Sequence, residues 1–275
     1  MEDQSAPAPP APPAPPPPPA PAPTPPTPPI RINRGERDET NYKRDIFDNK
    51  SNIEYLEPKF GNADDVSLGI EIINHETNLP YMSREEIKKS PSGYKADIII
   101  KFIQTNKVRY VSIKSLSGQK PSILNHTPRS ASAFQTTLRA CLDDIDRLAR
   151  EYIEKRSSGI IREDVKFCDL ESSKDENVRR SFADMLTYFV FKGTGSKMSP
   201  KECDSILIIN RDKTLTFIDC DTDEKKHNYI DSFIDKCVIS FRNKGMPSTV
   251  TDVCNAWIYT NNINGKKCGS IHVRL

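Results

Sequence analysis

Two short apolar segments, residues 97–103 and 108–114, constrain the fold of this chain more than any other feature of its sequence. Both are rich in Ile and Val, which favour extended backbone, and only Gln-Thr-Asn-Lys separates them. A polar spacer of this length predicts a tight turn between two antiparallel strands. We therefore expect a β-hairpin against which the other elements pack.

The ends of this hairpin carry groups suited to phosphodiester cleavage. Asp97 begins the first strand and Lys114 ends the second, so a tight turn brings them side by side. Because strand side chains alternate between faces, Ser112 shares a face with Lys114. Carboxylates hold divalent metal ions that activate water, and a lysine stabilises the charge that develops at phosphorus. A solvated lysine on an edge hairpin is the structural alternative.

The remaining segments predict a mixed α/β domain, in which helices flank a central mixed sheet. Apolar residues that recur every three or four positions predict helices over residues 62–78, 130–155, 176–191 and 229–241. The second helix is expected to pack along one face of the sheet, and the third to end at Gly193 or Gly195 in a left-handed conformation. Short apolar runs predict strands over residues 204–210, 214–218, 256–260 and 270–274, the first two as a hairpin.

The amino-terminal segment is unsuited to a folded core. Residues 1–30 are mostly Ala, Pro and Thr, so we expect a disordered tail that is a solubilising spacer or a ligand for proline-binding modules. Residues 31–60 are dominated by charges and Asn, which predicts a linker or a partly ordered lead-in with one short helix over residues 42–47. Residues 61–275 are expected to form the functional domain.

The composition permits a nucleic-acid partner without demanding one. The net charge is +2, which is mildly basic rather than polybasic. The seven cysteines are scattered, with no C-x-x-C pair and no histidine at zinc-ligand spacing, which predicts reduced thiols in an intracellular protein. Neither a secretion signal nor a membrane-spanning apolar run is expected.

The central hairpin resembles the active site of the PD-(D/E)xK nucleases, and in particular of their type II restriction endonucleases. Asp97 and the run Ser112-Ile-Lys114 match its acid and its lysine, and the polar segment 115–125 follows where such enzymes often meet DNA. The resemblance implies a restriction-endonuclease-like core over residues 61–275, with DNA-recognition elements towards the carboxyl terminus and Mg²⁺ as cofactor. Further segments similar in style are residues 191–196, 240–247 and 257–261.

Two positions depart from this motif. Ala96 stands where the family has a proline that is not a ligand, and Ser112 stands where an acidic residue is usual. Some restriction enzymes similarly place Ser there and recruit an acid from a neighbouring helix. The resemblance therefore implies that Glu71, on the helix expected before the hairpin, joins Asp97 as a metal ligand. The reserve candidates, both on the helix expected after the polar loop, are Asp143 and Asp146.

Polar loops supply candidate DNA contacts. Arg, Lys, Asn and Gln read base edges, while Lys, Ser and main-chain NH groups hold phosphates. A solvated loop or a helix cap also explains each position, so these residues are more persuasive as a group than singly. The candidates are Ser115, Ser117, Gln119, Lys120, Asn125, His126, Arg129, Lys192, Thr194, Arg242, Lys244, Asn261 and Lys266.

These features predict a sequence-specific endonuclease that hydrolyses double-stranded DNA with Mg²⁺. A nicking or DNA-repair nuclease on the same fold is the first alternative, and a non-catalytic DNA-binding protein with a degenerate site is the second. A methyltransferase that protects the same site is implied functionally, not as a bound subunit, and cutting at a palindrome suggests a homodimer or two successive nicks. The Ala/Pro tail resembles proteins of large algal viruses, with bacterial restriction modules as the other source, so the expected location is the host-cell cytoplasm or a virion.

Overall fold

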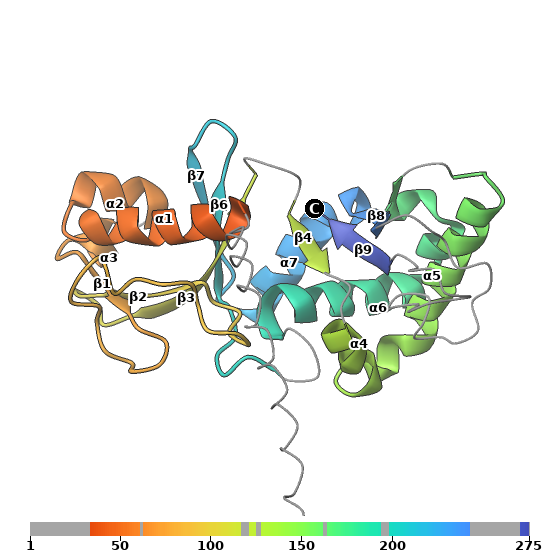
Figure 1. Ribbon diagram of the computed structural model, residues 1–275, viewed down its shortest axis with the longest axis horizontal. Coiled ribbons are helices and arrows are strands. Elements are labelled where there is room, and N and C mark those ends of the chain that lie inside the picture. The colour runs from red at the N-terminus through yellow and green to blue at the C-terminus, as the bar shows by residue number, and fades with distance from the viewer. Residues whose placement is uncertain are drawn as a thin grey trace, which may run out of the picture. The chain divides into compact units, whose positions relative to one another are not determined.

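The computed structural model describes residues 34–60, 63–116, 121–124, 128–161, 164–193, 198–242 and 270–274. The chain divides into two compact units, Met1–Ile32 and Asn33–Leu275. Every helix and strand named below belongs to the second unit (Figure 1). The expected tail over residues 1–30 lies outside the described residues.

A five-stranded mixed sheet is the main sheet of this unit, in agreement with the mixed α/β class predicted from the sequence (Figure 1). Its strands, in spatial order, are β1 (Ile70–Ile73), β2 (Ile98–Phe102), β3 (Val108–Ser115), β6 (Ser205–Ile209) and β7 (Leu215–Asp219). Both expected hairpins are confirmed, because β2 pairs antiparallel with β3 and β6 pairs antiparallel with β7. Strands β3 and β6 pair in parallel, so β3 has a partner along each edge.

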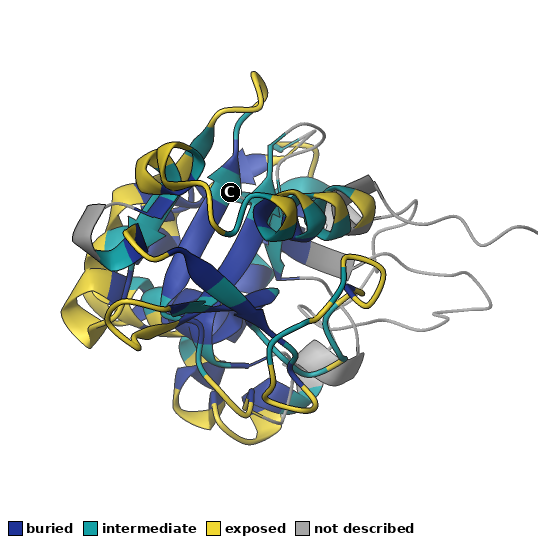
Figure 2. Cartoon of the chain, turned by 90° about the vertical axis from the view of Figure 1, so that its left-hand side faces the viewer, coloured by how far each residue is buried: buried dark blue, intermediate teal, exposed yellow. Residues whose placement is uncertain are grey.

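The two faces of this sheet meet different apolar cores, because side chains alternate along each strand. Helices α1 (Arg34–Asp48) and α2 (Ile53–Phe60) cover one face, where Ile46 of α1 is completely buried. Strand β6 belongs to both cores, since Leu207 packs under these helices and Ile206 packs in the other core. Figure 2 shows the buried residues gathered on the strands and the exposed ones on the outer helices and loops.

The lead-in is more ordered than expected, since the short helix predicted over residues 42–47 lies within the longer helix α1. Residues 34–60 form the two helices that cover the sheet, and Phe60 packs edge-on against Phe102 and Phe217 at ring-centroid distances of 6.2 and 5.6 Å. Most residues of α1 are polar and only a narrow stripe of this helix is buried, which is why its composition resembles that of a linker.

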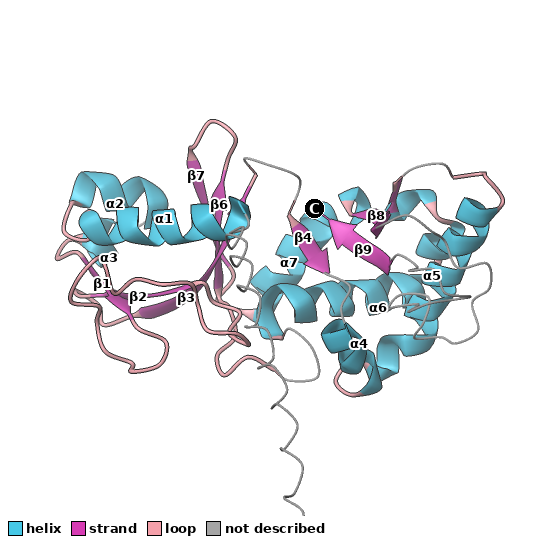
Figure 3. Cartoon of the chain, in the orientation of Figure 1, coloured by secondary structure: helices cyan, strands magenta, loops and turns pink. Residues whose placement is uncertain are grey.

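The remaining elements build a second core around helix α6 (Glu176–Thr187), which forms where the sequence predicted it (Figure 3). The N-cap Asp175 starts this helix, since its side chain accepts a hydrogen bond from the main-chain N of Asn177 at 2.9 Å. Helices α4 (Pro128–Gln135), α5 (Leu142–Ser157) and α7 (Asp223–Phe233) also contribute to this core.

A second sheet has the order β4 (Ser122–Leu124), β9 (Ser270–Arg274), β8 (Val238–Arg242) and β5 (Val165–Lys166). Strand β9 was expected, and the strand predicted over residues 256–260 lies outside the described residues.

The prediction of a helix over residues 62–78 is wrong. Only Ala63–Val66 is helical (α3), and Gly69, with a φ of +83°, turns the chain into strand β1. Ile70 and Ile72 then face the same core with a period of two. The apolar positions of this stretch fit a helix and a strand equally well, and the left-handed glycine decides between them.

The helix predicted over residues 130–155 is interrupted. Helix α4 is followed by a turn and by the 3-10 turn Arg139–Cys141 before α5 begins. Helix α5 packs against α6 rather than along the five-stranded sheet, so the predicted contact with that sheet is wrong.

The helix predicted over residues 229–241 begins and ends earlier than expected. Thr222 caps α7 by accepting a hydrogen bond from the main-chain N of Lys225 at 3.2 Å. The chain is extended again from Val238, because β8 pairs with β9 and its β-branched residues favour a strand. None of the described helices combines the length and the apolar content that crossing a bilayer requires.

Helix α6 ends in a π-helical turn, Tyr188–Lys192, rather than at a left-handed glycine. Gly193 is extended, with a φ of −155°, so the prediction is wrong for this residue, and Gly195 lies outside the described residues. A larger residue at 193 would displace the ring of Tyr188. A Cβ there would lie 2.3 Å from the hydroxyl oxygen of Tyr188.

Replacing Gly69 tests how the covering helices are joined to the sheet. A Cβ at this position would lie 2.5 Å from the carbonyl oxygen of Lys50, which accepts a hydrogen bond from the main-chain N of Ile70 at 2.8 Å. We expect Gly69→Ala to lower the free energy of unfolding in urea by about 3 kcal/mol, because this overlap adds to the cost of a left-handed alanine.

Gly159→Ala is the matched control for this substitution. Its φ is +76°, yet among the described residues, apart from its two chain neighbours, no atom lies within 4 Å of the position that a Cβ would take. It should lose only about 1–2 kcal/mol, the cost of the left-handed conformation. Equal losses in the two variants would contradict the close approach of Gly69 to Lys50.

Candidate active site

Asp97 is held in place by the strand beside it. Its main-chain N donates a hydrogen bond to the carbonyl of Val111 at 2.8 Å. Its Oδ2 accepts hydrogen bonds from the main-chain N of Ile113 at 2.6 Å and from Oγ of Ser112 at 3.0 Å. Ser112 is completely buried, so its hydroxyl orients the Asp97 carboxylate from inside the sheet.

Lys114 follows Ser112 on the same face of β3, as the strand period predicted. Parallel pairing places it beside Ile208 of β6, and its side chain is partly exposed. Burial raises the pKa of Glu39 and lowers the pKa of Lys95, and the positive charge of Lys114 lowers both pKa values. Lys114 therefore lies within electrostatic reach of an acid and of a second lysine.

Glu39 brings a second carboxylate to this place from helix α1. Burial raises the pKa of Glu39, and the negative charge of Asp97 raises it further. Lys43 and Lys114 oppose this shift, and Nζ of Lys43 lies 2.8 Å from Oε1 of Glu39. Glu39 is thus a partly buried acid whose pKa is raised by the charge of Asp97, and it is paired with a lysine one helical turn along α1.

Lys43 also ties helix α1 to the segment that leads into β2. It is buried, and its Nζ donates a hydrogen bond to Oγ of Ser90 at 2.7 Å. Ser90 Oγ in turn donates to the carbonyl of Asp97 at 2.6 Å. A continuous chain of polar contacts therefore holds the Glu39 and Asp97 residues in one framework.

Glu71, the second carboxylate expected from the sequence, is not brought to this place. It lies on strand β1 rather than on a helix, opposite Lys101 in the register with β2, and its Oε2 is 3.3 Å from Nζ of Lys101. Asp97 precedes Lys101 by four positions, which separates Glu71 from it by about 13 Å along the strands. The expectation that a preceding helix presents Glu71 to Asp97 is therefore wrong.

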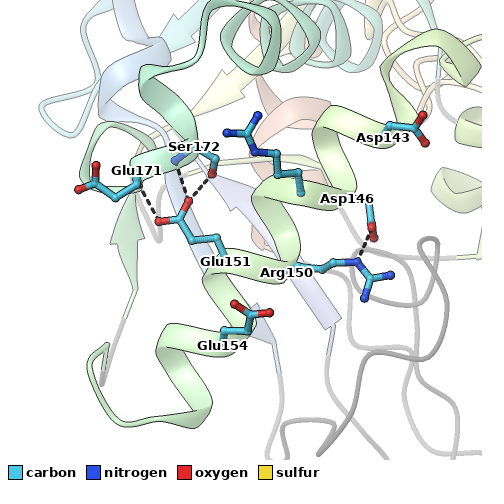
Figure 4. Close-up of a pocket in the computed structure, with 8 residues that line it drawn as sticks. Asp143, Asp146, Arg150, Glu151, Glu154, Glu171 and Ser172 are labelled. Atoms are coloured by element: carbon cyan, nitrogen blue, oxygen red, sulfur yellow. Dashed lines mark hydrogen bonds and ion pairs between the residues drawn. The ribbon is translucent and has the colours of Figure 1, made fainter.

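The reserve acids Asp143 and Asp146 line a different pocket, formed by α5 and the turn Glu171–Lys174 (Figure 4). Asp146 is buried, and its Oδ2 accepts a hydrogen bond from Nε of Arg150 at 2.5 Å. The side chains that line this pocket include none from the central hairpin. Neither acid is placed to complete a site with Asp97.

Lys95 adds a further positive charge next to Asp97. Burial and, after it, the charge of Lys114 lower the pKa of Lys95 to about 8, while the charge of Asp97 acts in the opposite direction. Its Nζ donates a hydrogen bond to the carbonyl of Phe189 in the π-helical turn. Its main-chain N donates to Oγ of Ser199 at 3.1 Å. The residue therefore joins the hairpin to the end of helix α6.

Glu39 and Asp97 are chemically suited to Mg²⁺, which prefers carboxylate oxygens. After burial, the charge of Asp97 is the largest cause of the raised pKa of Glu39, and a bound cation relieves repulsion of this kind. Within the described ranges, no group of three or more His, Cys, Asp or Glu side chains could hold a metal ion. Mg²⁺ commonly uses one or two carboxylates and keeps several waters, so two carboxylates are sufficient in number for this ion.

Most of the candidate DNA contacts fall outside the described residues. Oγ of Ser115 lies 3.2 Å from Oδ2 of Asp38 on α1, and Lys192 ends the π-helical turn with its side chain partly exposed. Arg129 lies in α4 and Arg242 ends β8, where only the backbone is described. Those outside the described residues are Ser117, Gln119, Lys120, Asn125, His126, Thr194, Lys244, Asn261 and Lys266.

Sequence patterns did not lead us to expect Glu39, Lys43 or Lys95 at the candidate site. Glu39, Lys43 and Ile46 are spaced as i, i+4 and i+7, so a helix over this stretch places both charged residues on the face marked by an apolar residue. That spacing was a usable signal. Lys95 stands in a loop, where no periodic pattern indicates burial.

Comparison with known proteins does not identify a family. No protein-family model matches the chain, and the search of curated protein sequences finds no match. The geometry of Glu39, Asp97 and Lys114 is therefore the basis on which a function is proposed.

The contacts of Glu151, in the pocket of Figure 4, should make the free energy of unfolding depend on pH. Burial acts to raise its pKa, but bonds from Lys155 and from the main-chain N atoms of Glu171 and Ser172, each at 2.7 Å, lower it to about 2. Folding favours the ionised form, so the stabilisation is complete above the ordinary value of 4.5 and is lost as the pH falls towards 2. We expect Glu151→Gln to lower the free energy of unfolding by roughly 2 kcal/mol at neutral pH.

Thermal unfolding at neutral pH and at a pH below the ordinary value for a glutamate measures this effect. Glu154→Gln is the matched control, because Glu154 is an exposed acid on the same helix and in the same pocket. The loss caused by Glu151→Gln should shrink in acid, while Glu154→Gln should change little at either pH. A loss of the same size at both pH values would show that the ionised form is not what stabilises this contact.

Proposed function

We propose that this chain is a Mg²⁺-dependent DNA endonuclease of the restriction type, a hydrolase of phosphodiester bonds. The observation that carries the proposal is that the charges of Asp97 and Lys114 both act on the partly buried acid Glu39, with Ser112 orienting Asp97. Two acids and a lysine are the set that metal-assisted phosphodiester hydrolysis uses. A mixed five-stranded sheet with helices on its faces is compatible with the restriction-endonuclease-like core that the sequence resembles.

The residues of the chain divide the chemistry between them. Mg²⁺ held by Glu39 and Asp97 would supply a Lewis acid and lower the pKa of a coordinated water. Lys114 stabilises the negative charge that develops on the phosphate in the transition state. Ser112 and Lys43 hold the two carboxylates before DNA arrives, so little reorganisation is needed during the reaction.

The proposed substrate is double-stranded DNA, with sequence read by polar side chains in its grooves. Such an activity requires a methyltransferase that protects the host DNA at the same site, acting on DNA and not as a bound subunit. Cleavage of both strands at a palindrome requires a homodimer or two successive nicks by one subunit. A DNA substrate also places the enzyme inside a cell or a virion.

Substitution at each proposed active-site residue tests the assignment. Asp97→Asn, Glu39→Gln and Lys114→Met should each slow Mg²⁺-dependent cleavage of a supercoiled plasmid by about 100-fold or more, while circular dichroism stays unchanged. Glu71→Gln is the matched control, because it removes a carboxylate whose partner is Lys101 and should cleave at close to the wild-type rate.

Each outcome of this assay indicates a different function or a different active site. Near-normal cleavage by Asp97→Asn or Lys114→Met would overturn the active site. Loss of cleavage in Glu71→Gln, with Glu39→Gln still active, would reinstate Glu71 as the second carboxylate. Conversion of the plasmid to open circles alone would identify a nicking or repair nuclease, and DNA binding without any Mg²⁺-dependent product would identify a non-catalytic DNA-binding protein.

Metal binding is measurable without DNA. Mg²⁺ at roughly 10 mM should raise the Tm of the wild-type protein by about 2–4 °C over NaCl of equal ionic strength. Asp97→Asn and Glu39→Gln should abolish this rise, because each removes a ligand charge, whereas Glu71→Gln should keep it. An equal rise in all of these variants would place the bound metal elsewhere.

A further inference from the structure

A small cavity lies beside Lys114, on the side of the sheet that meets the second core. Its volume is about 50 Å³, and its lining includes Lys95, Lys114, Ser122, Phe189, Tyr229 and Phe233. These side chains come from the hairpin and its flanks, from the π-helical turn and from helix α7. A cavity of this size holds a few water molecules or one phosphate group and is too small for a nucleobase.

The charges in this cavity favour an anion. Lys95 and Lys114 bring two ammonium groups into a lining that is otherwise largely aromatic and aliphatic. Charges attract an oppositely charged group more strongly where the surroundings are apolar, because the effective dielectric constant is lower. The charges of Lys95 and Lys114 repel each other, and the charge of Asp97 offsets this repulsion only in part, so a bound anion would be favoured.

The position of Lys95 is set in advance of any ligand. Its ammonium group donates to the carbonyl of Phe189, and its main-chain N donates to Ser199. A π-helical turn of this kind frequently marks a functional site, because it diverts carbonyl groups from the regular helix pattern. Here that turn holds a charged lysine at the wall of the cavity.

We propose that this cavity is a phosphate subsite, in which Lys95 and Lys114 together bind one phosphoryl group of the DNA strand. The inference rests on the proposed function for the source of that group, since a free phosphate ion has the same chemistry. In this subsite Lys95 binds the substrate, in addition to its hydrogen bond to the π-helical turn. No covalent step is involved, so the subsite acts by positioning the strand.

Inorganic phosphate tests the cavity in the absence of DNA and of metal. In EDTA, phosphate should raise the Tm of the wild-type protein above that in chloride of equal ionic strength, and Lys95→Met and Lys114→Met should both lose the rise. Lys107→Met is the matched control, because Lys107 is an exposed lysine in the hairpin turn and should keep it. No rise in the wild type, or an undiminished rise in a folded Lys95→Met or Lys114→Met protein, would overturn the subsite.

Binding of a fluorescent DNA duplex in EDTA, followed by anisotropy, identifies the source of the phosphate. Lys95→Met should weaken binding about tenfold and reduce the slope of log affinity against log salt by about one, while Lys107→Met keeps the wild-type slope. An unchanged slope in Lys95→Met, with cleavage still dependent on Asp97, would overturn the inference alone. A phosphate-dependent rise in Tm without any binding of DNA would keep an anion site and overturn the proposed function.

Discussion

Strand β3 is hydrogen-bonded along both of its edges, antiparallel to β2 and parallel to β6. Its two faces also meet different cores: Val111 and Ile113 pack beneath α1 and α2, while Ser112 and Lys114 face the opposite side. Such a strand cannot shift without breaking pairs on both edges and moving both cores. Ser112 and Lys114 therefore belong to a strand that is fixed along both edges and on both faces, and Asp97 is hydrogen-bonded to it.

Because the central strand has a buried serine at position 112 in place of an acid, the second acid of the candidate site comes from another element. Ser112 donates to Asp97 instead of presenting a carboxylate of its own, so the position supports the acid without adding charge. Helix α1 supplies that charge as Glu39 and supplies a counter-charge as Lys43 one turn later. Burying an acid is unfavourable unless it is paired, and the raised pKa of Glu39 records this cost. One helix thus delivers both the carboxylate and the lysine that makes its burial tolerable.

Local patterns predicted those elements whose partners lie close in the sequence. The two hairpins and helix α6 formed where turn residues, strand alternation and helical spacing indicated. The same reasoning failed between residues 62 and 78, where apolar positions suit both a helix and a strand until Gly69 takes a left-handed conformation. It predicted only residues 42–47 of helix α1, because the buried face of this helix is a narrow stripe on a largely polar segment. In both cases the deciding contact is with a distant part of the chain, such as Lys50 against Gly69.

The sequence by itself determined that Asp97 lies against Ser112 and that Lys114 shares the face of Ser112, because a short turn and a period of two residues specify which side chains face one another across a hairpin. Only the tertiary structure decided which acid accompanies them. Glu71 is near in sequence, but the strand register opposes it to Lys101. Glu39 is distant in sequence, but α1 docks on the sheet where residues 77 positions apart, Asp38 and Ser115, come into contact. Contacts across so long a loop depend on packing of the whole core, which no local pattern of residues encodes.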